Sequence, residues 1–401
     1  MIIQIILAFF IGILAGTITG LIPGIHINLI SVILLGSAAS LLAIASPLVL
    51  VVFIVAMSIT HTFLDYIPSI FLGAPDEDTA LSILPGHQFL LKGFGYIAII
   101  LTLYGSLFAL LIIIIFTPIF IFLLPIVYPY ILRIMSIILI LVSAYLIYNE
   151  KQKRFWALFI FILAGLLGIS TLNLGLKEPL LPLFTGLFGA SSLIMSIKKK
   201  IKIPKQKIPL IKTIRPNKKS LIKSGLAAII ASPLTAFLPG LGASQAAVIG
   251  SEVTELDQKE FLFLLGAINT IVMGLSFITY YSIQKTRTGA AVAVSKLLPR
   301  LTLTDLYIIV PVILLSGIVA AATTIFISRN ISKSIHKFDY TKISKFILGI
   351  LIIITFYFTG FTGLLIFIVS TSLGLTTILL GIRRMHLMGC LLIPTILYYI
   401  L

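Results

Sequence analysis

Long uncharged stretches separated by short charged ones dominate this chain. No Asp, Glu, Lys or Arg occurs before Asp65, and stretches such as 93–132 and 346–382 also carry none of them. One helical crossing of a bilayer needs about 20 apolar residues, so the pattern predicts about 10–14 crossings and half-crossings. We therefore expect an all-α polytopic integral membrane protein without a folded soluble domain.

Two apolar stretches are interrupted in the same way. Residues 19–31 read TGLIPGIHINLIS, and residues 235–247 read TAFLPGLGASQAA. The Thr and the Pro-Gly pair recur 216 positions apart, and Leu84-Pro85 matches Leu298-Pro299 at nearly the same spacing. Matched interruptions are typical of secondary transporters with duplicated halves. The sequence predicts two membrane repeats, 1–197 and 221–401.

Each Pro-Gly pair should split its helix. Proline removes a backbone donor and glycine allows the chain to unwind, while irregular backbone at membrane depth is tolerated only inside protein or beside a wet cavity. A restarting helix directs free N–H groups at that cavity, which favours an anion. Packing kinks are the alternative. The expected substrate-binding residues here are Pro23, Gly24, His26, Asn28, Pro239, Gly240, Gly242, Ser244 and Gln245.

The net charge of +17 is concentrated between the two halves. Residues 198–223 hold eleven of the 29 Lys and Arg residues and no acid, so the rest of the chain carries only +6. One basic linker between hydrophobic halves fits the positive-inside rule better than a nucleic-acid surface. We expect segment 198–220 to be a cytoplasmic linker in a multi-pass protein of the cell membrane, and we expect no nucleic-acid partner.

Charges in corresponding loops bear on the relative orientation of the repeats. Residues 74–92 are mainly acidic and the matching residues 284–305 mainly basic, which favours inverted repeats. Segments 149–154 and 329–345 are both basic, which favours parallel ones. We expect inversion.

Ionisable residues inside the apolar stretches are candidates for ion coupling. His61 and Asp65 are one helical turn apart and share a face. Such groups are costly in a membrane, so they point to a proton or cation relay, although an interhelical hydrogen bond explains them equally well. Asp76 belongs to an acidic cluster that could gather Na⁺ or form a solvated loop.

Several motifs resemble the large permease family of tripartite tricarboxylate transporters, TctA. LPGLGASQA at 238–246 is similar to its Pro-Gly-x-Gly signature, and GAPDEDTALSILPGHQFLLKG at 73–93 follows the order of a second family motif. Asn269-Thr270 in GAINTIVMG is similar to its paired Asn motif, and Arg383-Arg384 to its late basic pair. The resemblance spans most of the chain and implies Asn269 and Thr270 as substrate-binding residues.

The chain departs from the family pattern at positions that concern the substrate. Ile25-His26 replace a small residue and glycine, and SIQKTRTG at 282–289 replaces a Gly-Ile-Pro-Gly turn. The replacement introduces Arg287, which we expect to bind an anionic group through two hydrogen bonds. Its alternative is an ordinary basic loop, and for Arg383-Arg384 we favour a helix end at the membrane interface over a substrate role.

Enzymatic chemistry has little support in the sequence. There is no P-loop, zinc motif or nucleophile elbow, and the single cysteine, Cys390, forms no intramolecular disulfide. We expect no catalytic residues, no metal and no cofactor. A membrane enzyme acting on lipid would need several converging acids or histidines, which this chain barely provides.

The predicted function is secondary active transport of an organic anion coupled to H⁺ or Na⁺. The resemblance implies a di- or tricarboxylate, with a small membrane subunit and an extracytoplasmic binding protein as partners. The alternative is a translocase of the same architecture for polyprenyl phosphate or another lipid phosphate. A groove open to the bilayer would favour the lipid, and an enclosed aqueous cavity the carboxylate.

Overall fold

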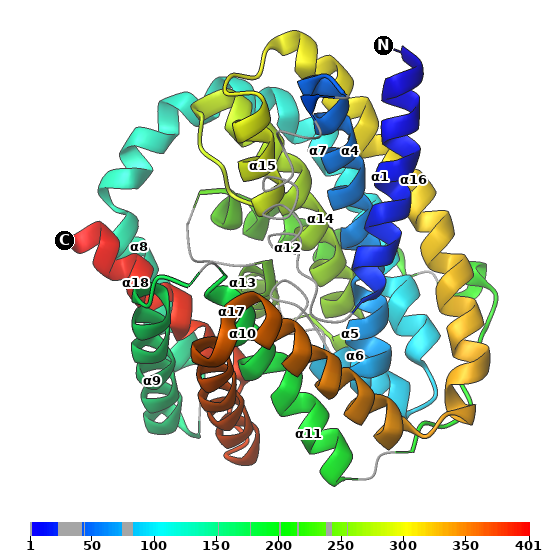
Figure 1. Cartoon of the computed structure of the whole chain (residues 1–401), viewed down its shortest axis with the longest axis vertical. Coiled ribbons are helices and arrows are strands. Elements are labelled where there is room, and N and C mark those ends of the chain that lie inside the picture. The colour runs from blue at the N-terminus through cyan, green and yellow to red at the C-terminus, as the bar shows by residue number, and fades with distance from the viewer. Residues whose placement is uncertain are drawn as a thin grey trace.

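The computed structural model describes residues 2–22, 42–43, 45–73, 83–150, 152–176, 178–199, 202–214, 216–237, 243–254 and 256–401. Within these ranges the chain is helical and contains no strand. Eight of the described helical segments are long and apolar enough to cross a membrane. The prediction of an all-α polytopic membrane protein is therefore confirmed (Figure 1).

The described helices fall into two groups, one on each side of the basic linker. The first half contains α1 (Ile2–Leu21), α4 (Pro47–Leu64), α5 (Tyr66–Leu72), α6 (Ile83–Leu91), α7 (Gly95–Arg133), α8 (Met135–Tyr148), α9 (Arg154–Asn173), α10 (Leu180–Phe184), the π-helical turn η2 (Thr185–Ala190) and α11 (Ser191–Lys198). The second contains η3 (Ile211–Thr213), α12 (Lys218–Phe237), α13 (Ala243–Thr254), α14 (Gln258–Ile283), α15 (Gly289–Leu297), α16 (Leu303–Ser334), η4 (Ile335–Lys337), α17 (Tyr340–Leu379), η5 (Arg384–Met388) and α18 (Gly389–Ile400).

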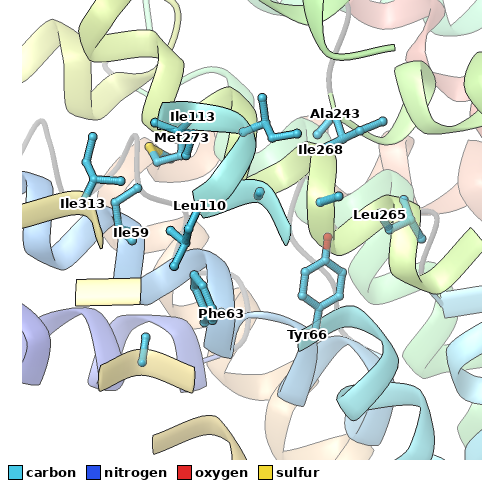
Figure 2. Packing of buried hydrophobic residues seen from close by; sticks show 14 of the residues in the cluster. Ile59, Phe63, Tyr66, Leu110, Ile113, Ala243, Leu265, Ile268, Met273 and Ile313 are labelled. Atoms are coloured by element: carbon cyan, nitrogen blue, oxygen red, sulfur yellow. The ribbon is translucent and has the colours of Figure 1, made fainter. Parts of the chain in front are cut away.

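Helices α4 and α14 belong to two of the most buried candidate spans and contribute much of the largest apolar core cluster. Figure 2 shows Ile59 and Phe63 of α4 packed among apolar side chains of α7, α14 and α16. Helices α1, α7 and α17 instead expose many large apolar side chains, such as Leu14, Leu111 and Tyr357. That exposure suits helices in contact with lipid tails.

Glycines bring the central helices into backbone contact. A β-carbon at Gly105 of α7 would collide with the carbonyl oxygen of Phe263 in α14, and one at Gly266 of α14 would collide with the carbonyl oxygen of Thr102. Ser106 of α7 also donates a 3.2 Å hydrogen bond to the carbonyl oxygen of Gly266. Close approach at small residues is a principal source of helix association in membranes.

The peripheral helices use the same kind of joint twice. Gly168 of α9 has no room for a β-carbon because the backbone of Cys390 in α18 lies against it. Gly374 of α17 likewise lies against the carbonyl oxygen of Leu187 in η2. Each joint therefore connects a helix of one half with a helix of the other.

Helix α17 contains a break within its 40 residues. Gly360 has φ 64° and ψ −159°, a conformation that glycine tolerates and other residues rarely adopt. Figure 1 shows the two arms of α17 running in different directions on either side of this point. The uncharged stretch 346–382 is thus shared between two helical arms.

The basic linker is attached to the helix bundle along part of its length. Its described part connects α11, which ends at Lys198, with α12, which begins at Lys218. Gln206 is buried and accepts a 2.8 Å hydrogen bond from the backbone N–H of Gly95 at the start of α7. The hydroxyl of Tyr104 donates to the carbonyl oxygen of Ile211 over 3.2 Å. The linker thus packs on the start of α7.

We expect Gly105→Ala to destabilise the protein, because the new methyl group would displace the backbone of Phe263. Overpacking of this kind costs roughly 1–3 kcal/mol. Gly349→Ala is the matched control, since nothing lies within 4 Å of its β-carbon position on α17. Thermal unfolding in detergent measures both variants, and equal unfolding temperatures would contradict the proposed joint.

Candidate functional site

A cluster of buried polar side chains lies where α4 and α14 cross. Asn269 of α14 donates a 2.8 Å hydrogen bond from Nδ2 to Oδ2 of Asp65, the residue that joins α4 to α5. The hydroxyl oxygens of Thr62 and Thr270 are 3.2 Å apart. All four side chains are buried, and Asp65 is only 5% exposed. Two polar pairs therefore link the central helices of the two halves.

Helix α1 adds a third polar pair at its C-terminal end. Nδ1 of His61 lies 3.1 Å from the hydroxyl oxygen of Thr19, and His61 is buried. Gly16 and Gly20 make this approach possible, because their missing side chains let α1 lie against the backbone of α4 at Met57 and His61. The last turn of α1 is thereby held beside the same turn of α4 that carries the cluster.

Asp65 has a special position among the acids of the chain. Among the eight candidate spans, it is the only Asp or Glu placed away from the first and last turns. Glu260 and Asp305 belong to capping boxes at the first turns of α14 and α16. An interior carboxylate in a membrane protein is costly and marks an ion pathway more often than a packing contact. Asp65 can accept a proton or bind a cation, whereas the capping acids serve helix ends.

Four of the predicted site residues thus lie in one cluster. His61 and Asp65 were predicted for ion coupling, and Asn269 and Thr270 for substrate binding. The structure joins both sets through the contact between Asn269 and Asp65. Through this contact, a change at Asp65 alters the hydrogen-bond acceptor that is available to Asn269.

Arg287 lies elsewhere. It follows the end of α14, where the chain turns back and brings the hydroxyl oxygen of Thr288 within 2.9 Å of that of Ser276. Arg287 interacts electrostatically with Tyr399 of α18. This contact places the arginine near α18, a helix that does not carry the polar cluster.

The remaining predicted residues fall outside the described part of the chain. They are Pro23, Gly24, His26, Asn28, Asp76, Pro239, Gly240 and Gly242, and the side chains of Ser244 and Gln245 in α13. The helices next to both Pro-Gly pairs are described. Helix α1 is described to Leu21, α12 to Phe237, and α13 from Ala243.

Sequence reasoning did not single out Thr62. It directly follows His61, just as Thr270 follows Asn269, so a polar residue followed by Thr occurs on both central helices. This repeated pair was a detectable signal, but its spacing of 208 positions differs from the 216 of the Pro-Gly pairs. Because of this difference, the two polar pairs do not align with each other when the halves are aligned on their Pro-Gly pairs.

Arg383 and Arg384 have different environments. Arg383 lies near Glu150, with Nε 3.5 Å from Oε2, and its side chain is 44% exposed, as expected at an interface. Arg384 is buried. Its guanidinium donates to the carbonyl oxygens of Leu187 and Phe188 over 2.9 Å and 2.6 Å. Arg384 thus follows the end of α17, and it is buried because the π-helical turn η2 offers it carbonyl acceptors.

Metal binding finds no support in the described residues. Within them, no three His, Cys, Asp or Glu side chains come together as ligands for an ion. Asp65 and His61 alone are too few for a structural metal site.

Comparison with known proteins identifies the family. A family model described as "Tripartite tricarboxylate transporter TctA family" matches residues 6–389. The chain is also 30% identical to an uncharacterized protein of Methanocaldococcus jannaschii, with 98% of this chain and 99% of the relative covered. No solved structure matches. The family match confirms the resemblance found in the sequence motifs.

We expect Asn269→Ala to lower the free energy of unfolding by about 1.5–3 kcal/mol, because a hydrogen bond to a charged group is lost. Denaturant unfolding in mixed micelles measures this change. Asn173→Ala is the control, since Asn173 is exposed and bonds only within α9 in the described contacts.

A double-mutant cycle with Asp65→Ala isolates the pair. The two losses should be non-additive if the two side chains interact, and additive losses would contradict the contact.

Proposed function

Because the chain belongs to the tripartite tricarboxylate transporter TctA family, we propose that it carries a di- or tricarboxylate across the membrane together with H⁺ or Na⁺. Membership makes the protein a multi-pass membrane transporter rather than an enzyme. The nature of the anion and the coupling ion are our proposal. The small membrane subunit and the extracytoplasmic binding protein of the family are proposed partners.

The contact between Asp65 and Asn269 carries the proposal. Asp65 is the coupling group, and Asn269 and Thr270 face the substrate from the neighbouring helix. Protonation or cation binding at Asp65 changes the acceptor available to the Asn269 amide, which then reorients toward the anion or away from it. The contact gives coupling a physical route that needs no large rearrangement.

The second part of the proposal is that the halves are structural repeats. Gly168 of α9 lies against Cys390, and Gly374 of α17 lies against Leu187. Gly374 follows Gly168 by 206 positions, and Cys390 follows Leu187 by 203. The two joints are therefore the same contact with the roles of the halves exchanged.

A second pair of contacts repeats the exchange. Gly186 of η2 lies 2.7 Å, measured from its β-carbon position, from the carbonyl oxygen of Phe367 in α17, and Gly389 of α18 lies against the carbonyl oxygen of Phe161 in α9. The spacings are again 206 positions for the phenylalanines and 203 for the glycines. A pseudo-two-fold axis between two repeats produces such pairs of contacts, in which the two repeats swap roles.

The directions of the long helices support inversion of the repeats. Phe94 before α7 and Asp257 before α14 line one groove, so both helices start at the same end of the molecule. Leu303 at the start of α16 lines a different groove with Tyr281 near the end of α14. Helices α7 and α16, which occupy equivalent places in the two halves, therefore start at opposite ends.

Inverted repeats give the transporter two related conformations. When each half adopts the conformation that the other half had, the transporter closes on one side of the membrane and opens on the other. The cluster at Asp65 lies between the central helices of both halves and is available to both states. The predicted anion site at Pro23-Gly24 follows the end of α1, whose Thr19 contacts His61.

We expect Asp65→Asn to abolish accumulation driven by an ion gradient, since an amide neither takes up a proton nor provides a negative charge. Uptake of labelled citrate-like acids into liposomes under imposed H⁺ or Na⁺ gradients should fall at least tenfold. Exchange of labelled for unlabelled substrate without a gradient should persist. Asp339→Asn is the matched control, because Asp339 caps α17 at its exposed start and Asn is an equally good cap.

Two outcomes would contradict the proposal. Unchanged gradient-driven uptake in Asp65→Asn would remove Asp65 from coupling. Absence of uptake of every citrate-like acid by the folded parent protein would remove the carboxylate substrate.

We expect Pro23→Ala and Pro239→Ala to weaken substrate binding, because each restores a backbone donor and favours an unbroken helix. The concentration of substrate that gives half-maximal uptake should rise at least several-fold in both variants. A third variant, Arg287→Gln, tests the predicted contact between Arg287 and the anion. Parent behaviour in all three variants would mean that the site is assigned incorrectly, even if transport itself is observed.

A further inference from the structure

A groove of about 880 Å³ lies at the end of the molecule where α7, α12 and α14 begin. The linker forms one wall of it through Lys207, Ile208 and Ile214, and the three helix starts form the others. Helices α7 and α14 are apolar spans, so their first turns lie where the hydrocarbon region gives way to headgroups. The groove is therefore at the depth of the membrane interface.

Hydrogen bonds hold the linker wall in place. The side-chain amide of Gln206 donates to the carbonyl oxygens of Leu90 and Pro204 over 3.1 Å and 2.7 Å. The backbone N–H of Lys207 donates to the carbonyl oxygen of Gly93 over 2.8 Å. A segment attached at consecutive residues to the end of α6 and the start of α7 provides a wall of defined shape.

The side of the groove formed by α7 and α14 is apolar, whereas α12 contributes polar residues such as Ser220. Phe94, Ile97 and Leu101 line it from α7 and the residue before it, and Phe263 lines it from α14. Ile97 and Leu101 are one helical turn apart and so lie on one side of α7. A row of this kind suits a hydrocarbon chain better than it suits a small polar solute.

Two lysines and two acids line the rim, so their charges balance, and the excess positive charge comes from the linker beside it. Lys207 and Lys259 are exposed at the rim, and Nζ of Lys207 lies 5.0 Å from the centre of the Phe94 ring. The acids at the rim are engaged elsewhere. Asp257 accepts backbone hydrogen bonds at the start of α14, and Glu260 lies 3.7 Å from Nζ of Lys223. The surrounding linker adds only basic charges, so the rim attracts an anion.

We propose that this groove binds one anionic membrane phospholipid, with its phosphate between Lys207 and Lys259 and one acyl chain along Phe94, Leu101 and Phe263. The amphipathic lining selects a ligand with a charged head and an apolar tail. Because the linker wall connects the two halves of the chain, the bound lipid contacts both. The site is separate from the Asp65 cluster and does not depend on what the transporter carries.

Native mass spectrometry of the full-length protein tests the proposal directly. The protein is equilibrated with equal amounts of dioleoyl phosphatidylglycerol and dioleoyl phosphatidylcholine in detergent. We expect retention of one phosphatidylglycerol molecule in preference to phosphatidylcholine. The double variant Lys207→Ser/Lys259→Ser should lose that preference, with phosphatidylglycerol affinity reduced about tenfold and phosphatidylcholine affinity unchanged.

The control variant Lys333→Ser/Lys342→Ser removes the same charge from two exposed lysines outside the groove. It should retain the preference of the parent protein. Equal loss of preference in both double variants would overturn the groove site, because general attraction between a basic protein and anionic lipid would then explain the binding.

A second variant tests the apolar part of the site. Ile208→Trp enlarges a partly buried linker residue and should lower retention of phosphatidylglycerol several-fold with the charge unchanged. Added glycerol phosphate should not compete with the lipid, since it lacks the chain. Efficient competition, unchanged retention in Ile208→Trp, or occupation of the groove by a second copy of the protein would each overturn the proposal.

Discussion

Apolar side chains give two helices little reason to associate inside a bilayer, because lipid tails are as apolar as leucine. Contact between backbones at small residues must replace the hydrophobic effect. In this chain Gly16 brings α1 against α4, Gly105 and Gly266 bring α7 against α14, and Gly168 brings α9 against α18. The positions of the helices, and of every polar group that they carry, follow from these joints.

The same joints explain how a carboxylate is kept in the middle of the structure. Close packing of α1 on α4 places Thr19 beside His61, and the crossing of α4 and α14 places Asn269 beside Asp65. Desolvation makes such groups costly unless polar partners compensate. The partners come from two other helices, α1 and α14, so motion of either one changes the surroundings of this polar cluster, as the proposed coupling role of Asp65 requires.

The exchanged glycine contacts and the basic linker concern the relation between the halves. If the halves are inverted repeats, the joints at Gly168 and Gly374 are equivalent, and each can adopt the conformation of the other. The linker has no counterpart in this symmetry, because a duplicated chain has only one connection. Its attachment to the start of α7, and the groove that it closes, make one end of the molecule different from the other.

The all-α membrane class and the family followed from the sequence, because they depend on local composition and on short local motifs. Asp65 was recognisable as an unusual acid in an apolar stretch. Its contact with Asn269, 204 positions away, was not recognisable, because only packing decides which faces of two helices meet. The burial of Arg384 was hidden for the same reason, since its carbonyl partners arise from a π-helical turn almost 200 residues earlier. Local chemistry thus determined which segments cross the membrane, whereas backbone contacts between distant glycines decided which polar groups meet.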